Sequence, residues 1–244
     1  MIELSVVMPV YDEIGVIEGV LRDHRRTLDE RFAPGTTEIV VVDDGSTDGT
    51  AALLDRLAGE IPGLVVLHQP RNAGPGPAVH RALATATGRW LLHLDADGQT
   101  QAADVERLWD RRAEADLLIG VRTPRRDPRH RLAVTWVTRQ VVRVVGGCRL
   151  RDANCPFKLF RREVWDDVRP LIDETAFAPS LLLAVGAVRR GWRVVEVPVA
   201  HRPRPAGRST FRMGRLAGAL VAAGRQVVVF RVRLLRAGAP PARS

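Results

Sequence analysis

Short apolar runs, rich in β-branched residues, alternate with longer stretches of helical periodicity through the first half of the chain. The apolar runs predict buried strands at 4–10, 38–44, 64–69, 89–97 and 115–121. The stretches between them predict helices at 16–32, 49–61, 78–86 and 102–114. Strands that are apolar along their whole length and are separated by helices are typical of a parallel sheet covered on both faces. With right-handed crossovers, this order predicts an α/β fold with a doubly wound, mostly parallel sheet.

The second half is less regular. Its patterns predict an amphipathic helix at 130–146, a strand that turns into a helix at 157–165, a helix at 180–191, a strand at 192–201 and a basic, apolar helix at 212–236. The character of the sequence changes near residue 122, and we find no linker or repeat. We therefore expect one domain over 1–211, with halves 1–121 and 122–211, followed by a basic amphipathic helix and tail over 212–244.

Acidic residues gather where three of the predicted strands end. They are Tyr11-Asp12-Glu13, Asp43-Asp44-Gly45 and Asp95-Ala96-Asp97. Ligands of doubly wound sheets bind outside the carboxyl ends of the strands, so these clusters mark a candidate site. If strand geometry persists, Asp95 and Asp97 lie on one side and Gln99 continues the alternation. Oxygen ligands suit Mg²⁺ or Mn²⁺, so these three residues form a candidate metal site; the alternative is a pair of turn or cap acids.

Two loops carry further polar chemistry. In "VVVDDGSTDGT", Asp48 can cap the next helix, whereas Asp43 or Asp44 could accept hydrogen bonds from a base or ribose. In "RNAGPGPAVHRAL", glycines let the backbone approach a ligand closely before a helix begins. Prolines interrupt the G-x-G-x-x-G spacing there, which disfavours a dinucleotide-binding fold.

Charge is distributed unevenly along the 244 residues. The formal net charge is +9, and Lys158 is the only lysine. From Pro198 to the end there are ten arginines and no acid. A one-sided basic field favours an anionic partner, such as phosphate ligands, an anionic membrane surface or nucleic acid. The alternative is an ordinary solvated surface.

Composition narrows the classes of partner and the expected location of the protein. Nucleic acid is disfavoured as a partner, because aromatic residues make up only 5% of the chain and the acidic residues cluster where the nucleic acid would have to bind. Two cysteines are typical of a reducing cytosol. No signal peptide or uninterrupted apolar span is apparent. We expect a cytoplasmic protein, peripheral at the cytoplasmic face of a membrane.

Seven segments resemble, in order and spacing, the motifs of family 2 glycosyltransferases with a GT-A fold. They are "VVMPVYDE", "EIVVVDDGSTDGT", "NAGPGPA", "HLDADGQ", "GVR", "DANCPFKLFRREV" and "RPAGRSTF". The resemblance runs from about residue 4 to residue 212 and is nearest to the dolichol- or polyprenyl-phosphate mannosyltransferase branch. It implies that 1–121 binds a nucleotide sugar and that 122–211 receives the acceptor.

The resemblance also implies roles for residues of the donor site. Pro9, Tyr11 and Glu13 resemble the first loop that contacts the nucleoside, and Asp44 resembles the acid that binds the base. The Asp95–Asp97 motif looks like the D-x-D that holds the metal and the diphosphate, with Gln99 as a further ligand.

Four residues resemble the catalytic and phosphate-holding positions of the family. Arg122, Arg204 and Ser209 look like positions that hold donor or acceptor phosphates. Asp152 resembles an acid that serves as general base toward a hydroxyl, or only orients the site when the acceptor is already anionic. The alternative for Asp152 is a turn acid paired with a neighbouring arginine.

The resemblance implies an inverting, metal-dependent transferase that uses a GDP- or UDP-linked sugar. The expected acceptor is a polyprenyl or dolichyl phosphate, with the basic tail docked on an anionic membrane. An alternative is a soluble hydroxyl acceptor, which Thr210 favours because a lysine commonly stands there in this branch. A nucleic-acid-binding protein is the remote alternative.

Overall fold

A computed structural model describes residues 1–123, 140, 143, 147, 149–176, 178–200 and 216–238, with side chains after residue 200 described from 225 onward. Most of the predicted helix 130–146 lies outside these residues. So do Arg204, Ser209 and Thr210.

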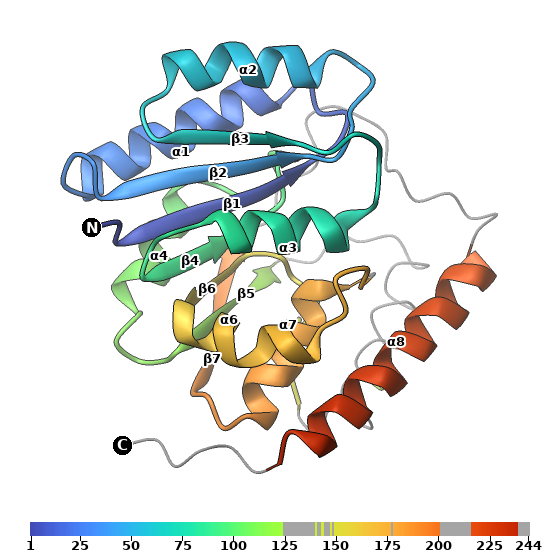
Figure 1. Ribbon diagram of the computed structural model, residues 1–244. Coiled ribbons are helices and arrows are strands. Elements are labelled where there is room, and N and C mark those ends of the chain that lie inside the picture. The colour runs from blue at the N-terminus through green and yellow to red at the C-terminus, as the bar shows by residue number, and fades with distance from the viewer. Residues whose placement is uncertain are drawn as a thin grey trace.

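Within the described residues, seven strands form one sheet in the order β3-β2-β1-β4-β6-β5-β7 (Figure 1). Their bounds are β1 Leu4–Val10, β2 Thr37–Asp43, β3 Leu64–His68, β4 Trp90–His93, β5 Leu117–Thr123, β6 Lys158–Arg161 and β7 Val194–Ala200. All neighbouring pairs are parallel except those made by β6, which runs antiparallel between β4 and β5. The predicted mostly parallel sheet is confirmed, and the one reversed strand among the described residues, β6, lies inside the sheet next to the central strand β4.

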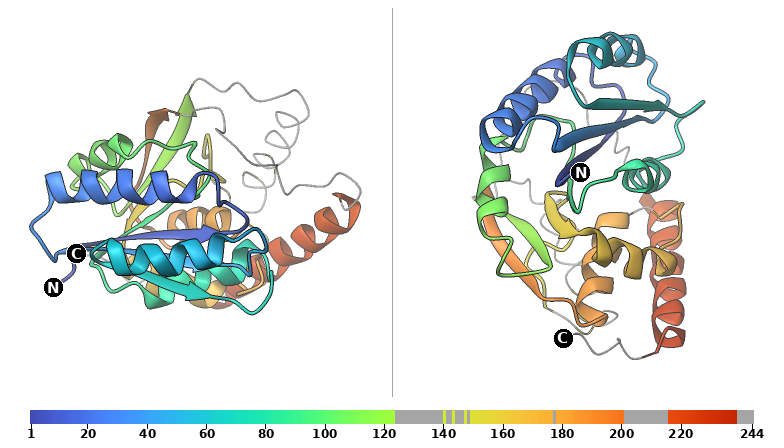
Figure 2. Two further views of the ribbon diagram at one scale, coloured as in Figure 1. Left: turned by 90° about the horizontal axis from the view of Figure 1, so that it is seen from above. Right: turned by 60° about the vertical axis from the view of Figure 1, so that its left-hand side comes forward.

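Helices cover both faces of this sheet, as predicted (Figure 2). On one face lie α1 Ile17–Arg31, α2 Thr50–Glu60 and α4 Ala103–Asp110. On the other lie α3 Pro75–Thr85, α6 Arg162–Val168, the 3₁₀ turn η1 Arg169–Leu171, α7 Pro179–Arg189 and α8 Leu216–Arg236. Each face has its own apolar core, because the central strands alternate side chains between the two faces. Within the described part of the chain, no helix has both the length and the hydropathy of a bilayer-spanning segment.

Several predicted boundaries differ from those observed. The strand predicted to reach residue 97 ends at His93, after which Gly98 takes a left-handed φ of 72° and the chain turns. The helix α3 begins earlier than predicted, at Pro75, since a proline fits the first position of a helix, where its missing N–H is not needed. The helix α4 ends at Asp110, four residues early, and a turn follows. The expected division near residue 122 falls at the end of β5 and stays a prediction.

Candidate functional site

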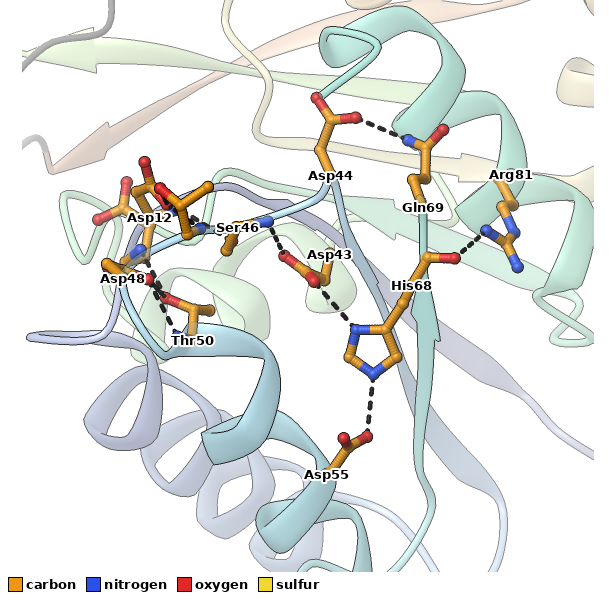
Figure 3. Close-up of polar contacts among 12 residues, drawn as sticks. Asp12, Asp43, Asp44, Ser46, Asp48, Thr50, Asp55, His68, Gln69 and Arg81 are labelled. Carbon is orange, nitrogen blue, oxygen red and sulfur yellow. Dashed lines mark hydrogen bonds and ion pairs between the residues drawn. The ribbon is translucent and has the colours of Figure 1, made fainter. Parts of the chain in front are cut away.

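Asp12 joins the loop after β1 to the loop after β2 (Figure 3). Its backbone has a φ of 53°, the only left-handed conformation at a non-glycine residue in the described chain. The Asp12 N–H donates to Ser46 Oγ at 3.0 Å, and Asp12 Oδ1 accepts from the Thr47 N–H at 2.7 Å. Such a conformation is costly for most residues, and the two bonds across the loops hold it in place.

Asp48 and Thr50 also connect the loop after β2 to the loop after β1. Asp48 accepts from the Thr50 N–H at 3.0 Å, the first N–H of α2, and from the Ile14 N–H at 3.1 Å. Thr50 Oγ1 in turn accepts from the Glu13 N–H at 3.0 Å. Asp48 thus binds the start of the helix as predicted, although Gly49 occupies the cap position with a φ of 96°. It also fixes the loop that carries Tyr11 and Glu13, which the sequence did not indicate.

The loop after β3 closes on Asp44. This buried carboxylate accepts from Gln69 Nε2 at 2.9 Å, from the Ala73 N–H at 2.8 Å and from the Gly74 N–H at 2.9 Å. Burial raises the pKa of Asp44, and the two backbone N–H groups oppose that shift. The glycine-rich loop, which we expected to approach a ligand, therefore also binds Asp44, the predicted base-binding acid.

Gly45 and Tyr11 show how tightly these loops meet. A Cβ at Gly45 would lie 2.6 Å from the carbonyl carbon of Arg71, so only glycine fits. Asp12 raises the pKa of the Tyr11 phenol, which also bonds to Asn72 and interacts with Asp44. We call residues 11–14, 44–50 and 69–74 the β1–β3 loops. They bring Tyr11, Glu13 and Asp44 together beside the end of β1, where Pro9 lies.

Asp43, the other candidate for base binding, is engaged below the loops (Figure 3). Its carboxylate is 2% exposed, accepts from the Ser46 N–H at 3.0 Å and contacts His68 Nδ1 at 2.9 Å. His68 Nε2 contacts Asp55 of α2 at 2.9 Å, and the bond to Asp43 is the main reason that the pKa of His68 is raised. Asp43 thus supports the loop from below, and of the two candidates for base binding Asp44 is the one that lies among the β1–β3 loops.

The metal-site candidates Asp95, Asp97 and Gln99 follow β4 in a turn. The Leu94 N–H still donates to Val7 O at 3.2 Å, but Asp97 Oδ1 accepts from the Gln99 N–H at 3.1 Å, as in a turn. Asp95 is exposed and Asp97 half-buried. The predicted strand alternation over these residues is therefore wrong, because the strand ends before them.

The oxygen donors of this turn still suit a divalent cation. Among the described residues, no three histidine, cysteine, aspartate or glutamate side chains form a metal-binding group. Two carboxylates and an amide instead fit Mg²⁺ or Mn²⁺, which often keep only one or two protein carboxylates and complete their shell with phosphate and water. The residues present thus fit an ion that arrives with a diphosphate.

Arg122 and Asp152, predicted separately, bind each other. Arg122 Nε donates to Asp152 Oδ2 at 2.8 Å, and Arg122 Nη2 donates to Asp152 Oδ1 at 2.9 Å. The Asp152 side chain is 3% exposed and that of Arg122 is 20% exposed. Glu196 Oε1 of β7 accepts from the N–H groups of Arg151 at 2.6 Å and of Asp152 at 3.2 Å. The arginine that pairs with Asp152 thus comes from β5, not from the turn itself.

Lys158 is a buried cation that sequence reasoning did not assign to the site. It begins β6, pairs with His93 of β4 and Ile119 of β5, and is fully buried. Its Nζ donates to Ala153 O at 3.0 Å, to Ser180 Oγ at 2.5 Å and to the carbonyl of Cys155. Burial lowers the pKa of Lys158 to about 8.

Three charged side chains act on this ammonium group. Asp152 and Asp95 favour the charged form of Lys158, whereas Arg122 opposes it. The reversed strand β6 therefore brings the ends of β4 and β5 to one place. We call Asp95–Thr100, Arg122, Asp152 and Lys158 the β4–β6 edge. A sequence signal existed, since a lone lysine in an apolar strand requires partners.

The chain was compared with known proteins. Residues 5–169 match the sequence profile of the family described as glycosyl transferase family 2. Glycosyltransferase AglD of Haloferax volcanii is 33% identical over 209 residues, covering 83% of this chain and 34% of that protein. Polyprenol monophosphomannose synthase of Mycolicibacterium smegmatis is 35% identical over 180 residues, covering 69% of this chain and 68% of that protein.

A solved structure confirms the GT-A fold. It is a mannosyltransferase from Pyrobaculum calidifontis in complex with GDP-Man and Mn²⁺, with a TM-score of 0.63, 22% identity and coverage of 98% of this chain and 66% of that one. The chain spans between about one third and two thirds of the length of the first curated relatives that it matches. The profile match covers well over half of the sequence, and the chain belongs to glycosyl transferase family 2.

Proposed function

We propose that the protein is an inverting, metal-dependent glycosyltransferase that moves a sugar from a GDP- or UDP-linked donor to a polyprenyl or dolichyl phosphate. One observation carries the proposal: the Asp95–Asp97 turn follows the central strand β4, with the β1–β3 loops on one side in the sheet order and the Arg122–Asp152 pair on the other. A nucleoside, a diphosphate and an acceptor would then lie in series along one edge of the sheet.

The β1–β3 loops would hold the nucleoside. Asp44 would accept a hydrogen bond from an N–H group of the base, which uracil and guanine both offer. Three loop donors already orient its carboxylate. Hydrogen bonds among the β1–β3 loops also hold Tyr11 and Glu13, so the binding surface is formed before the donor arrives. This lowers the entropic cost of binding.

Asp95, Asp97 and Gln99 would hold Mg²⁺ or Mn²⁺ together with the donor diphosphate. When bound, such a cation neutralises the charge that grows on the departing nucleoside diphosphate. Arg122 would bind phosphate oxygen from the same side, because a guanidinium has five N–H donors and can bind Asp152 and a phosphate together. Arg204 and Ser209 are proposed for the acceptor phosphate, on the resemblance alone.

The state of Asp152 supports a phosphate acceptor over a hydroxyl. Both oxygens of Asp152 accept hydrogen bonds from Arg122, so a proton taken from a hydroxyl would neutralise the carboxylate and weaken this ion pair. A phosphate is already anionic at pH 7 and needs no base. The names of several relatives, among them the polyprenol monophosphomannose synthase, support the same acceptor class. We therefore propose that the protein works at the cytoplasmic face of a membrane, bound peripherally.

Thermal unfolding with nucleotides would test the donor site. GDP or UDP should raise the melting temperature more with Mn²⁺ than without it. At a hundredfold excess of nucleotide over Kd, the free energy of unfolding should rise by about 2.7 kcal/mol. Equal melting temperatures with every nucleotide would overturn the donor assignment. Sugar transfer to detergent-dispersed polyprenyl phosphate, compared with transfer to soluble hydroxyl acceptors, would then decide between the two acceptor classes.

A further inference from the structure

The helix α8 presents apolar side chains on two opposite faces. Its inner face carries Phe230 and Leu234, which are buried in the core beside α7. Its outer face carries Val228, Val232 and Leu235, which are 61%, 40% and 62% exposed. An ordinary amphipathic helix needs only one apolar face to pack against its sheet or bundle. The second apolar face of α8 therefore needs a separate explanation.

The inner face fixes the orientation of α8 on the protein. Phe230 packs over Gly186 of α7, where an added Cβ would lie 3.4 Å from Phe230 Cζ and 2.4 Å from Val168 Cγ1. Gln226 Nε2 donates to Thr175 O at 3.0 Å, and Arg233 lies 3.6 Å from Asp173. These contacts join α8 to the body of the protein along its second half, so its outer face is the side turned away from the protein.

Three exposed arginines flank the outer apolar side chains. At 100° per residue, Val228, Val232 and Leu235 lie within about 60° of one another around the helix axis. Arg231 lies on one side of them, and Arg225 and Arg236 lie on the other; all three are exposed. The sequence of α8 contains no acidic residue. An apolar centre between two cationic borders is the pattern of a helix that lies in the interface of an anionic bilayer.

A second copy of this chain fits the face poorly. A two-fold contact between identical α8 faces would bring arginines against arginines, which is repulsive. Three aliphatic side chains also fall short of the roughly 800 Å² per partner that a stable protein interface buries. An anionic lipid surface offers hydrocarbon to the centre and negative charge to both borders.

We propose that the outer face of α8, formed by Val228, Val232, Leu235 and the flanking Arg225, Arg231 and Arg236, docks the protein on an anionic bilayer. The inference rests on the proposed function in that a lipid acceptor gives the docking its purpose. The helix begins on the side of the molecule toward which the carboxyl ends of β1, β2 and β3 point (Figures 1 and 2). Docking through α8 would thus bring the edge that carries the candidate site close to the lipid surface.

Vesicle flotation of the full chain would test this surface. Vesicles of phosphatidylglycerol and phosphatidylcholine, compared with phosphatidylcholine alone, should carry the protein only when the anionic lipid is present. The variant R225Q/R231Q/R236Q should lower partitioning by about 100-fold, at roughly fivefold per arginine near the surface. The variant V228S/V232S/L235S should lower it by about 10-fold or more, through lost apolar burial.

The matched control is R22Q/R26Q/R56Q, which removes the same charge from exposed positions on α1 and α2. This control should float nearly as well as the unaltered protein. Equal losses in control and α8 variants would overturn the docking face, as would α8 variants that float normally or that change only the oligomeric state. Melting temperatures within about 2 °C of the unaltered protein would show that the variants fold.

Activity separates this inference from the proposed function. On detergent-dispersed polyprenyl phosphate the α8 variants should turn over normally, and on vesicles they should be slow. A protein that floats through α8 but transfers no sugar would overturn the function and leave the docking face standing. A protein that transfers sugar but never floats with vesicles would overturn the docking face and leave the proposed function standing.

Discussion

The two parts of the candidate site are built from different interactions. The β1–β3 loops are joined mainly by backbone N–H groups that donate to the side-chain oxygens of Asp12, Asp44, Ser46 and Thr50. The β4–β6 edge is joined by charged side chains, namely Arg122 with Asp152 and the buried Lys158. The first part has its shape fixed by many moderate bonds. The second depends on a few buried charges that balance one another.

This difference indicates which part responds to a bound ligand. A nucleoside is uncharged and adds hydrogen bonds to loops that are already ordered. A diphosphate with its cation brings large charges beside Asp95 and Arg122, whose charges already act on Lys158. We expect binding of the diphosphate to change the β4–β6 edge more than the β1–β3 loops.

Asp97→Ala should have the largest effect. Turnover should fall by about 1,000-fold, equivalent to ~4 kcal/mol in the barrier, because charge stabilisation of the leaving group is lost. Steady-state transfer rates provide the measurement. Asp110→Ala, at an exposed acid at the end of α4, is the control and should change little. Wild-type rates in Asp97→Ala would remove the metal role from this turn.

Arg122→Met should destabilise the fold strongly. It leaves Asp152 buried without its bidentate partner, at a cost of about 3 kcal/mol or more. Urea unfolding at pH 7 would measure this cost. Arg111→Met, which removes an exposed pair with Glu114, should cost less than about 1 kcal/mol. Similar costs for the two variants would show that the charges of the β4–β6 edge count for no more than surface charges.

Lys158 should titrate at about pH 8 instead of its ordinary 10.5, because burial disfavours its charged form. Between these values the unfolded chain binds the extra proton on Lys158, so Lys158 should contribute a rise of up to about 3 kcal/mol in the free energy of unfolding with pH. Cys155, whose pKa burial raises to about 11, opposes this rise above about pH 9, so the contribution of Lys158 is measured as the difference between the unaltered protein and Lys158→Met. Lysine is present only once, so NMR of isotope-labelled lysine would report a single side chain. Lys158→Met should lack this slope. A midpoint near 10.5 would contradict the buried environment.

Thr50→Val should have the smallest effect, since it removes two of the many hydrogen bonds in the β1–β3 loops. Losing the hydroxyl, which accepts from the Glu13 N–H and donates to Asp48 Oδ1, should cost about 1–2 kcal/mol and weaken donor binding slightly. Urea unfolding and nucleotide titration would measure both. Thr85→Val, on the exposed side of α3, is the matched control. A loss as large as that of Arg122→Met would erase the contrast between the two regions.

Much of the fold was predictable because its first half repeats strand and helix with clear periodicity. The predicted strand over 4–10 coincides with β1, and the predicted change from strand to helix within 157–165 is confirmed by β6 and α6. The direction of β6 was not predictable, because a strand buried on both faces inside a mostly parallel sheet is apolar whichever way it runs. Its neighbours in the sheet depend on contacts distant in sequence.

The candidate site was predictable as a set of residues but not as a set of contacts. Asp44 and Asp95 follow strand ends and Arg122 lies at the end of β5, and sequence patterns reveal where strands end. The pairing of Arg122 with Asp152 depends on β6 lying between β4 and β5, and so does the place of Lys158. The clamp of His68 between Asp43 and Asp55 likewise needs the register of β2 with β3.

The insertion of β6 between β4 and β5 has a consequence for folding during synthesis. The strands β3, β2, β1 and β4 pair through connections made early in the chain, so they can associate as soon as they leave the ribosome. β4 then keeps an open hydrogen-bonding edge, because β5, which is made next, belongs one place further out. Until β6 arrives, that edge is where a nascent chain is most exposed to mispairing and chaperone capture.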